Sequence, residues 1–420
     1  MKVCVIGSGG REHALAWRLS ISPSVTKVYA IPGSAAMSDC AELVGIDWQQ
    51  SNHLISFLKD NQVDLVVVGP EAPLVAGLAD VLNKAGIPVF GPSKAAAQLE
   101  GSKVFAKDLM KKYNIPTAAY GVFHKVDEAK AFIAQTGAPI VVKADGLAAG
   151  KGVVVAMTID EANVAVEDML SGNRFGDAGS TVVIEEFMEG EEASLLAFVD
   201  GKTVVPMIAS QDHKRIFDGD KGPNTGGMGT YAPAPVLTDA LRDEAMKTIL
   251  EPMVAAMEKE GMPYVGCLYA GLMITDEGPK VVEFNARFGD PETQVVLPLL
   301  DSDLGEIMMA CVKGTLTSNM VKWKDSSAAC VILASKGYPE TSSKGDVISG
   351  DIKQYDTTIV FHSGTKLVGE NYVTNGGRVL GVVGLGKDLR TALDRAYERI
   401  EHIDFEGMQY RTDIGAKAFK

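Results

Sequence analysis

The first hundred residues alternate short apolar runs with amphipathic stretches, and this alternation limits the fold more than any other feature of the sequence. The predicted strands cover residues 3–6, 27–31, 65–68 and 89–90, and helical patterns such as residues 76–85 separate them. Repeated strand and helix units form parallel sheets covered by helices. We therefore predict a Rossmann-like α/β unit whose ligand-facing loops follow the carboxyl ends of its strands.

Length and composition narrow the class of protein. At 420 residues, the chain exceeds what one hydrophobic core usually organises, so several domains are expected. Its formal net charge of -14 disfavours non-specific binding to nucleic acid and adhesion to anionic membranes. Five scattered cysteines without a C-x-x-C pair argue against a disulfide framework or a zinc site. With no apolar stretch of about 18 residues, the sequence predicts a cytoplasmic protein without a membrane span.

The pattern changes near Ser102, where a second domain is expected to begin with a helix through Met110. Strands predicted within residues 150–200 suggest a small, largely antiparallel unit, and they cover residues 153–156, 182–186 and 193–199. Residues 211–231 are rich in glycine and polar side chains, so we expect a functional loop there. A hairpin is predicted further on, between residues 268–274 and 280–284.

The chain after Trp323 is predicted to form a small α+β cap. Three strands are expected in it, followed by an amphipathic helix from Asp388 to about Ile403. The strands cover residues 329–334, 358–361 and 378–383.

A glycine-rich turn, Gly7-Ser8-Gly9-Gly10, lies between the first predicted strand and a helix predicted over residues 12–19. Such a turn lets the backbone approach an anion, and the helix start offers free N–H groups to a phosphate. A dinucleotide fingerprint would need glycine where Glu12 stands, and no acidic residue follows the second predicted strand. We therefore expect a site for one phosphate with Arg11 as a partner; the alternative is a tight turn without a ligand.

Lys143 ends a predicted buried strand and opens a second glycine-rich loop, which contains Gly150, Lys151 and Gly152. The loop is not a P-loop, because its spacing is one residue short and Gly152 stands where a serine or threonine would hold magnesium. A lysine at a strand end followed by a loop with another lysine suits a flap that covers a triphosphate. The alternative is that both lysines are ordinary solvated loop residues.

Three apolar residues at 182–184 run into five acidic residues within a short span, beginning with Glu185. The backbone of a strand edge can bind adenine, and a nearby carboxylate can hold ribose hydroxyls. An acidic hairpin on a solvated face is the alternative.

Glu283, Asn285 and Arg287 alternate along a predicted strand, so their side chains are expected on one side of it. Two oxygen ligands beside a guanidinium suit a site for magnesium and phosphate, because Mg²⁺ completes its shell with phosphate oxygens and water. Such a site neutralises charge in phosphoryl transfer. A polar strand face with an Arg–Glu ion pair is the alternative.

The Lys143 loop, the Glu185 strand and the Glu283-x-Asn285-x-Arg287 strand occur in the order found in the ATP-grasp ligases. The stretch Arg287-Phe288-Gly289-Asp290-Pro291-Glu292 is similar to the signature of the phosphoribosylamine–glycine ligase family. The likeness runs from Met1 through the C-terminal tail, and it includes Gly7 to His13, Gly69-Pro70-Glu71-Ala72-Pro73-Leu74 and Asn224-Thr225-Gly226-Gly227-Met228-Gly229. One feature departs from the wider superfamily: the strand before Glu283, at Tyr269-Ala270-Gly271-Leu272, lacks a second metal-binding carboxylate, for which Asp212 is a candidate.

The resemblance implies an α/β and α+β multidomain fold. Its parts would be a Rossmann-like domain over residues 1–101, an ATP-grasp region over 102–325 with a mobile lid at about 120–190, and a small α+β C-terminal cap over 326–420. The implied activity joins glycine to 5-phospho-D-ribosylamine with ATP, through glycyl phosphate, in de novo purine biosynthesis. Mg²⁺ or Mn²⁺ would be the metal cofactor of this reaction. The implied enzyme is a cytoplasmic monomer that acts on small molecules, not on nucleic acid or membranes.

The resemblance also assigns roles to individual residues. ATP would contact Lys103, Lys143, Gly150, Lys151, Gly152, Glu185, Glu186, Phe187, Glu191 and Glu192. The metal would be held by Glu283 and Asn285, while Arg287 and Lys143 would act on the transferring phosphoryl group. The other substrates would contact Gly9, Gly10, Arg11, Glu12, Glu71, Asp212, Lys214, Asn224, Gly227, Asp290, Pro291 and Glu292. No general base is assigned, because an amine already attacks an acyl phosphate readily.

Two other functions fit parts of the sequence. One is another carboxylate–amine or carboxylate–thiol ligase on the same scaffold. Asp290-Pro291-Glu292 and the loop from Gly7 to His13 disfavour it, because these motifs relate to the substrates and not to ATP. A non-catalytic nucleotide-binding or NAD-sensing module is disfavoured by the missing glycine at position 12.

Overall fold

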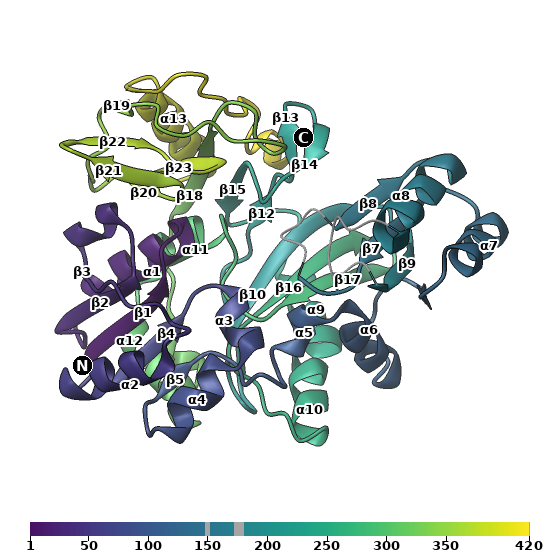
Figure 1. Ribbon diagram of the computed structural model, residues 1–420, viewed down its shortest axis with the longest axis horizontal. Coiled ribbons are helices and arrows are strands. Elements are labelled where there is room, and N and C mark those ends of the chain that lie inside the picture. The colour runs from purple at the N-terminus through teal and green to yellow at the C-terminus, as the bar shows by residue number, and fades with distance from the viewer. Residues whose placement is uncertain (148–151, 172–179, 420) are drawn as a thin grey trace.

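The computed structural model describes residues 1–147, 152–171 and 180–419, and its N-terminal part is a parallel sheet covered by helices (Figure 1). The strand order is β3-β2-β1-β4-β5. These strands are β1 (Lys2–Gly7), β2 (Lys27–Pro32), β3 (Glu42–Leu43), β4 (Leu65–Val68) and β5 (Val89–Phe90). Val3 and Val5 of β1 enter one core cluster while Cys4 and Ile6 enter another, as expected of a strand covered on both faces. The predicted Rossmann-like α/β unit is confirmed.

Helices and short 3-10 turns cover this sheet. They are α1 (Gly10–Ser20), a 3-10 turn at Ala35–Asp39, α2 (Ser51–Asp60), α3 (Glu71–Ala76) and α4 (Leu78–Lys84). The helix predicted over residues 76–85 is confirmed as α4, but it begins only at Leu78, because Gly77 adopts a left-handed conformation with φ of 96° and separates α3 from α4. An L-residue seldom adopts this conformation, so the glycine ends one helix and starts the next.

The central part is an antiparallel sheet in the order β11-β10-β16-β17. Its strands are β10 (Glu191–Asp200), β11 (Val204–Pro206), β16 (Val265–Thr275) and β17 (Gly278–Asn285). The predicted hairpin is confirmed as β16 and β17. Residues 193–199 were expected in the small antiparallel unit, and this is wrong: most of β10 is buried, so it lies inside the central sheet beside β16.

Helices lie before, between and after the strands of the central sheet in the sequence. They are α5 (Gln98–Gly101), α6 (Lys103–Lys112), α9 (Asp239–Ala245), a π-helical turn at Met246–Leu250, α10 (Glu251–Lys259), α11 (Thr293–Leu299) and α12 (Leu304–Lys313).

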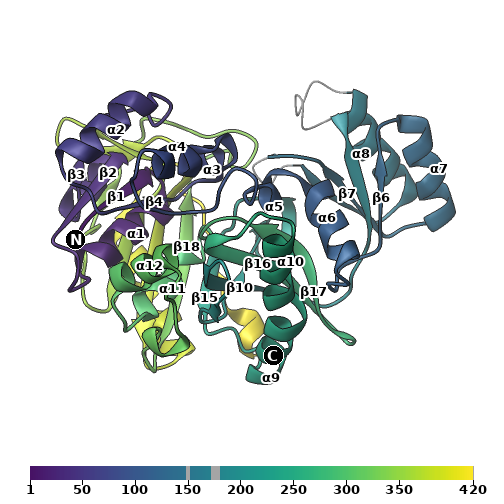
Figure 2. The same ribbon diagram turned by 90° about the horizontal axis from the view of Figure 1, so that it is seen from below.

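A second antiparallel sheet, in the order β6-β9-β7-β8, forms a separate small unit with two helices. Its elements are β6 (Tyr120–Phe123), α7 (Val126–Thr136), β7 (Ile140–Ala144), β8 (Val153–Ala156), α8 (Ile159–Ser171) and β9 (Val182–Glu186). We call this unit the lid. Figures 1 and 2 both show it at the opposite end of the molecule from the N-terminal sheet.

Residues 211–231 form short strands, so the predicted loop is wrong. The strands are β12 (Gln211–Asp212), β13 (Arg215–Phe217), β14 (Lys221–Asn224) and β15 (Gly229–Ala232). Polar contacts hold the tip of the β13–β14 hairpin against the C-terminal segment: Gly219 N donates to Asp413 Oδ2 at 2.8 Å, and Arg411 Nη1 lies 2.9 Å from Asp220 Oδ1. This explains why a polar sequence is ordered here.

The C-terminal part is α+β, as predicted, and it shares a sheet with the central part. The order β12-β15-β18-β23-β20 places β18 directly beside β15. The helix expected to reach Ile403 ends earlier, at Ile400, because Ile403 enters a short strand. The elements are a 3-10 turn at Ser318–Met320, β18 (Ser327–Ala334), β19 (Ser349–Gly350), β20 (Thr358–His362), β21 (Thr365–Val368), β22 (Asn371–Thr374), β23 (Arg378–Gly386), α13 (Leu389–Ile400), β24 (Ile403–Asp404) and a 3-10 turn at Ala416–Phe419.

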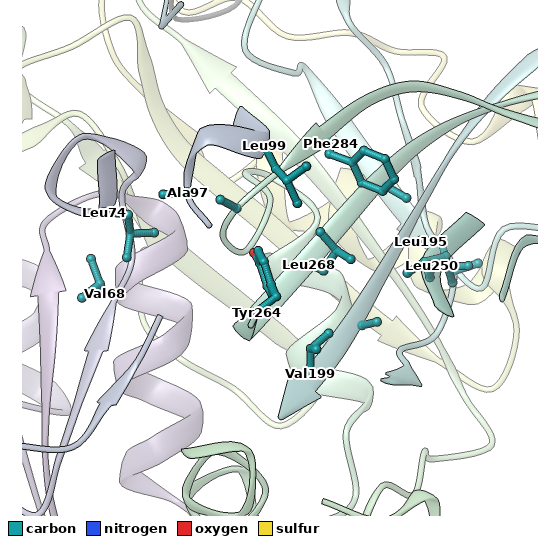
Figure 3. Close-up of a cluster of buried hydrophobic side chains, with 14 of the residues drawn as sticks. Val68, Leu74, Ala97, Leu99, Leu195, Val199, Leu250, Tyr264, Leu268 and Phe284 are labelled. Atoms are coloured by element: carbon teal, nitrogen blue, oxygen red, sulfur yellow. The ribbon is translucent and has the colours of Figure 1, made fainter. Parts of the chain in front are cut away.

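Two large hydrophobic clusters each join the N-terminal, central and C-terminal parts. Figure 3 shows one of them, in which Leu74 and Val68 of the N-terminal part belong to the same cluster as Leu268 and Phe284 of the central sheet. The lid has its own cluster of buried side chains, which includes Ile133, and no residue of that cluster belongs to the other two. Among the described residues, no helix combines the length and apolarity that a membrane crossing needs.

Candidate active site

At the base of the lid, two lysines meet one carboxylate. Lys143 Nζ at the end of β7 lies 3.0 Å from Glu185 Oε1, and Lys107 Nζ of α6 lies 3.0 Å from Glu185 Oε2. None of the three side chains is more than 5% exposed. Lys143 also donates to the carbonyl oxygen of Val282, at 3.0 Å, so it links the lid to the central sheet. Burial lowers the pKa of Lys107 to about 8, although the charge of Glu185 opposes this shift.

Lys103 lies at the start of α6, close to the loop that follows Lys143. Its backbone N–H donates to Asp145 Oδ1 at 2.6 Å, and its Nζ donates to the carbonyl oxygen of Gly146 at 2.9 Å. Burial lowers the pKa of Lys103, while Glu283 acts in the opposite direction. This lysine therefore faces the same region as Lys143; its phosphate-binding role, which the family resemblance implies, stays a prediction.

Glu283 lies on β17 among cations from three different parts of the chain. Burial alone would raise its pKa, but Lys214, Lys143 and Lys103 outweigh this effect and hold the pKa of Glu283 below its usual value. Its carboxylate therefore stays charged at neutral pH and is available as an oxygen ligand.

Asn285 and Arg287 follow Glu283 at alternate positions, and their side chains meet: Arg287 Nη2 donates to Asn285 Oδ1 at 3.4 Å. The strand ends at Asn285, so Arg287 lies just beyond it and not on it as expected. Glu100 holds the guanidinium at 2.7 Å and Glu71 holds it at 3.3 Å. Burial would lower the pKa of Arg287, but these two carboxylates raise it above its ordinary value, so the group is a permanent cation.

Glu12 explains the glycines of the N-terminal turn. Its Oε2 accepts the backbone N–H of Gly9 at 2.7 Å and its Oε1 lies 2.6 Å from Arg11 Nε. A Cβ atom on Gly7 or Gly69 would lie 2.4 Å or 2.2 Å from atoms of the Glu12 side chain, closer than such atoms approach. The glycines therefore make room for this carboxylate. Arg11 is buried and its guanidinium also lies 3.8 Å from Glu71.

A cavity of about 550 Å³ opens beside this turn, at the carboxyl ends of β1, β2 and β4. Gly9 and Glu12, both predicted to contact substrate, line it. Parallel sheets bind ligands at this edge. The remaining lining residues are Gly7, Ser8, Pro32, Gly45, Ile46, Asp47, Trp48 and Pro70.

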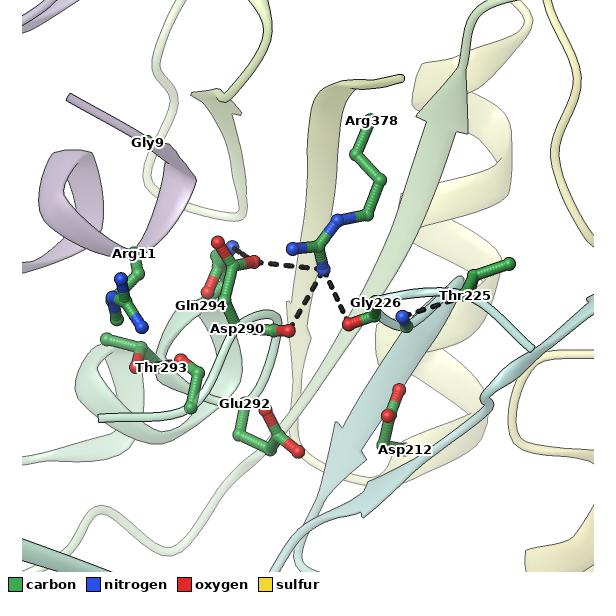
Figure 4. Close-up of polar contacts among 12 residues, drawn as sticks. Gly9, Arg11, Asp212, Thr225, Gly226, Asp290, Glu292, Thr293, Gln294 and Arg378 are labelled. Atoms are coloured by element: carbon green, nitrogen blue, oxygen red, sulfur yellow. Dashed lines mark hydrogen bonds and ion pairs between the residues drawn. The ribbon is translucent and has the colours of Figure 1, made fainter. Parts of the chain in front are cut away.

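Three parts of the chain meet at Asp290 (Figure 4). Arg378 Nη1 of the C-terminal part lies 3.3 Å from Asp290 Oδ1 and donates to the carbonyl oxygen of Gly226 at 2.8 Å. Gln294 donates to Asp290 Oδ1 at 2.9 Å, and a Cβ on Gly10 would lie 2.9 Å from Gln294 Nε2. We call the group Gly9, Gly10, Gly226, Asp290, Gln294 and Arg378 the three-way junction. Burial would raise the pKa of Asp290, but Arg378 and Arg11 hold it below its usual value.

Asp212 and Glu292 flank the junction (Figure 4). Burial and the charge of Glu292 raise the pKa of Asp212 well above its usual value, although Lys214 opposes this. Glu292 Oε1 accepts a hydrogen bond from Tyr269 at 3.0 Å. Gly227 fits between Asp212 and Pro291, where a Cβ would lie 2.8 Å from Asp212 Oδ1. The polar loop around residue 226 and the segment from Asp290 are thus packed together.

The other residues that were predicted to contact ATP or the other substrates are spread over several elements. Glu186 ends β9 with an exposed side chain, and Phe187 follows it. Glu192 lies 2.9 Å from Lys214, and Glu191 accepts a hydrogen bond from Gln211 at 3.2 Å. Asn224 lies at the end of the β13–β14 hairpin, Gly152 is buried just before β8, and Gly150 and Lys151 lie outside the described residues.

The residues at Glu283 fit a divalent cation bound together with phosphates. Among the described residues, no group of three or more His, Cys, Asp or Glu side chains could hold a metal ion by itself. Glu283 and Asn285 offer two oxygens beside Lys103, Lys143 and Arg287. Mg²⁺ binds through one or two carboxylates and takes its other ligands from phosphates and water, so this donor set fits it.

Sequence reasoning missed three residues that complete the site. Lys107 and Glu100 pair with predicted residues, and Arg378 ties the cap to Asp290. Their partners are far away in the sequence, so no local spacing revealed them. The one signal was Gly376-Gly377-Arg378, an arginine directly after two glycines at the start of a predicted strand.

The lid, the central sheet and the lysines that face Glu283 are features of the ATP-grasp class of enzymes, and comparison with known proteins supports this. Residues 101–293 match the ATP-grasp (A) domain of phosphoribosylglycinamide synthetase, residues 1–100 its N domain and residues 328–417 its C domain. The chain belongs to the phosphoribosylglycinamide synthetase family, which confirms the resemblance, and it is an ATP-grasp ligase.

Individual relatives agree over the whole length. Phosphoribosylamine–glycine ligase of Halalkalibacterium halodurans is 53% identical over 418 residues, which are 100% of this chain and 97% of the relative. The crystal structure of the Thermotoga maritima phosphoribosylamine–glycine ligase has a TM-score of 0.87 at 34% identity, covering 99% of this chain and all of that one. The biotin carboxylase domain of Hydrogenobacter thermophilus 2-oxoglutarate carboxylase, in complex with MgADP, ADP and bicarbonate, has a TM-score of 0.76 at 16% identity, with 97% of this chain and 91% of that chain covered. At that identity the likeness concerns the fold alone.

Proposed function

We propose that this chain joins glycine to 5-phospho-D-ribosylamine with ATP, giving glycinamide ribonucleotide, ADP and phosphate in purine biosynthesis. The observation that carries the proposal is the short distance along the chain from Glu283, among its cations, to Asp290 at the three-way junction. One segment thus connects a site suited to phosphoryl transfer with a site suited to the other substrates. The full-length relative from Halalkalibacterium halodurans carries the name of this activity.

In this proposal, ATP lies between the lid and the central sheet. Lys103 and Lys143 contact its phosphates, the backbone from Glu185 to Phe187 contacts adenine, and Glu191 or Glu192 holds the ribose. Glu283 and Asn285 would hold Mg²⁺, or Mn²⁺ in its place, which neutralises charge on the phosphates.

The reaction has two steps. A carboxylate oxygen of glycine attacks the γ-phosphorus of ATP, and the bond to ADP breaks, which gives glycyl phosphate. The amine of phosphoribosylamine then attacks the acyl carbon, phosphate leaves with the bonding electron pair, and the amine loses a proton. Arg287 stabilises charge on the transferring group, and Glu71 and Glu100 fix its position in advance.

Phosphoribosylamine is placed in the cavity beside the N-terminal turn, with Gly9, Gly10, Arg11 and Glu12 near its phosphate and Glu71 near its amine. Glycine is placed between Asp290 and the Asp212–Glu292 pair, with Lys214, Asn224, Gly227 and Pro291 around it. The cavity and Asp290 are neighbours, since a Cβ on Gly9 would lie 4.0 Å from Asp290 Oδ2. In this proposal, the lid beside ATP and the C-terminal cap beside Asp290 exclude the water that would hydrolyse glycyl phosphate. We place this activity in the cytoplasm, in a monomeric enzyme that requires neither nucleic acid nor a membrane.

The test is magnesium-dependent release of phosphate from ATP with glycine and freshly generated phosphoribosylamine, each omitted in turn. Release that requires both, with an equal amount of glycinamide ribonucleotide, is the expected result. Release only with a different acid or amine would keep the ATP-grasp chemistry and reject this pair of substrates.

A further inference from the structure

The lysine pair at the base of the lid contains a residue without an assigned role. Glu185 binds Lys143 through one carboxylate oxygen and Lys107 through the other, at 3.0 Å each. All three groups are buried. The set therefore holds two positive charges and one negative charge, with a sum of one positive charge.

The two lysines face different surroundings. Lys143 donates to Val282, the residue before Glu283, so it borders the site described above. Lys107 donates instead to Thr117 Oγ1 at 2.8 Å and to the carbonyl oxygen of Ala118 at 3.4 Å. Thr117 in turn donates to the carbonyl oxygen of Val281 at 2.7 Å. Lys107 therefore binds the other carboxylate oxygen of Glu185 and has hydrogen-bond partners that Lys143 does not share.

We propose that Lys107 is a positioning residue for nucleotide phosphates: it neutralises Glu185, so that Lys143 keeps a net positive charge toward the ligand. The inference rests on the proposed function only in taking a nucleoside di- or triphosphate as the ligand. Without Lys107, the Glu185–Lys143 pair is electrically neutral, although the lysine that touches phosphate is still present. A buried neutral pair attracts an anion far less than a buried net charge does.

A merely structural role for Lys107 makes a different prediction. In that case its bonds to Thr117 and Glu185 would serve only to fix α6 against β9, and restoring the charge balance would not restore binding. Changing Glu185 together with Lys107 therefore distinguishes the electrostatic role of Lys107 from a purely structural one.

The test measures binding of Mg·ADP to the full chain by calorimetry, in the wild type and in variants of both residues. Lys107→Met is expected to weaken binding by about 5- to 10-fold, because one positive charge is lost in a partly polar interior while the lysine that touches phosphate stays. Lys107→Arg keeps the charge and should stay within about threefold of the wild type. Lys107→Met combined with Glu185→Gln leaves Lys143 as a single net cation and should recover most of the affinity.

Lys112→Met removes the same charge from the same helix at an exposed position, paired with Glu260, and should leave binding within about twofold. Affinity unchanged in Lys107→Met, or a double variant that binds no more tightly than Lys107→Met, would overturn the proposal. If Lys107→Met does not fold, Glu185→Gln alone decides: binding at least as tight as in the wild type supports the proposal, and clearly weaker binding refutes it.

This readout is independent of the glycine reaction. A wild-type chain that binds Mg·ADP but shows no glycine-dependent turnover would reject the proposed function while the charge argument is still tested by the variants. A wild-type chain that does not bind Mg·ADP would reject both.

Discussion

The lid carries a hydrophobic core of its own, in which Ile133, Val142 and Ile184 are buried, whereas the three-way junction rests on a core that several parts of the chain share. Leu15 of α1, Val295 of α11 and Ile332 of β18 belong to that shared cluster. The lid is joined to the rest by polar contacts such as Lys143 to Val282. A unit with its own core and polar contacts at its base can move as a body, while the junction cannot move without opening a common core. In the proposed function, the nucleotide would contact the part with its own core, and the other substrates would contact the part that rests on the shared core.

Glu283 lies on β17 of the central sheet, outside the lid, and its removal should have the largest effect on turnover. Glu283→Ala removes the charged oxygen ligand, so turnover should fall on the order of a thousandfold and the magnesium requirement should rise. Steady-state kinetics across a magnesium titration measures both. Glu277→Ala, at the exposed tip of the same hairpin, is the control. Turnover within tenfold of the wild type would remove Glu283 from the site.

Separate cores predict separate unfolding. Ile133→Ala in the lid and Ile332→Ala in the shared core each delete a buried side chain, at a cost of about 3 kcal/mol. Hydrogen exchange should report lost protection only in the lid for Ile133→Ala, and across all three other parts for Ile332→Ala. If Ile133→Ala also lowered the protection of β1 and β23, the lid would not be an independent unit.

Arg378 should affect the junction and not the nucleotide. Arg378→Met leaves Asp290 without its main counter-charge, so glycine-dependent turnover should fall by about 100-fold. Affinity for Mg·ADP should stay near that of the wild type, and Arg378→Lys should lie between the two. A parallel loss of nucleotide affinity would contradict the division between the two regions.

The contact between α1 and the cap should depend on pH. His13 Nδ1 accepts the backbone N–H of His362 at 3.0 Å, which only the neutral ring can do. Burial lowers the pKa of His13 to about 3, below its ordinary value of 6.5. The unfolded chain therefore takes up a proton before the folded one as pH falls, and folding stability is lost below pH 6.5, by about 2 kcal/mol at pH 5 for this group. Urea unfolding should show a smaller pH slope in His13→Gln but not in His53→Gln, which changes an exposed side chain. Equal slopes in all three proteins would exclude His13 as the source.

The smallest effect is expected in the lid. Lys143→Ala should raise the apparent KM for ATP by about tenfold while kcat changes less, because other cations still face the phosphates. Lys130→Ala, on the outer helix of the lid, serves as the control. Unchanged KM in Lys143→Ala would contradict its assignment to the nucleotide.

Local patterns predicted much of this fold, and distant partners account for what they missed. The strands at residues 65–68 and 153–156 followed directly from apolar runs between turn residues. The sheet to which β10 belongs depends on β16, which lies some seventy residues further on, and the hairpin of β13 and β14 depends on polar groups near Arg411. Neither dependence is visible in a short window of sequence.

The same limit applies to the site. Glu283, Asn285 and Arg287 could be found because they alternate along one short stretch of sequence, and Asn285 and Arg287 do meet in the structure. Lys107, Glu100 and Arg378 could not, because each acts on a residue that only the folded chain places beside it. The roles assigned to individual residues stay predictions until the variants above are measured.

The pairing of β15 with β18 bears on how the chain is made. During synthesis, β15 emerges from the ribosome almost a hundred residues before β18, and β23 follows later still. Until then the central part presents an open strand edge, which is the kind of surface that aggregates. A nascent chain cut short before β18 would keep that edge exposed. The C-terminal part therefore cannot be exchanged or removed as an independent domain.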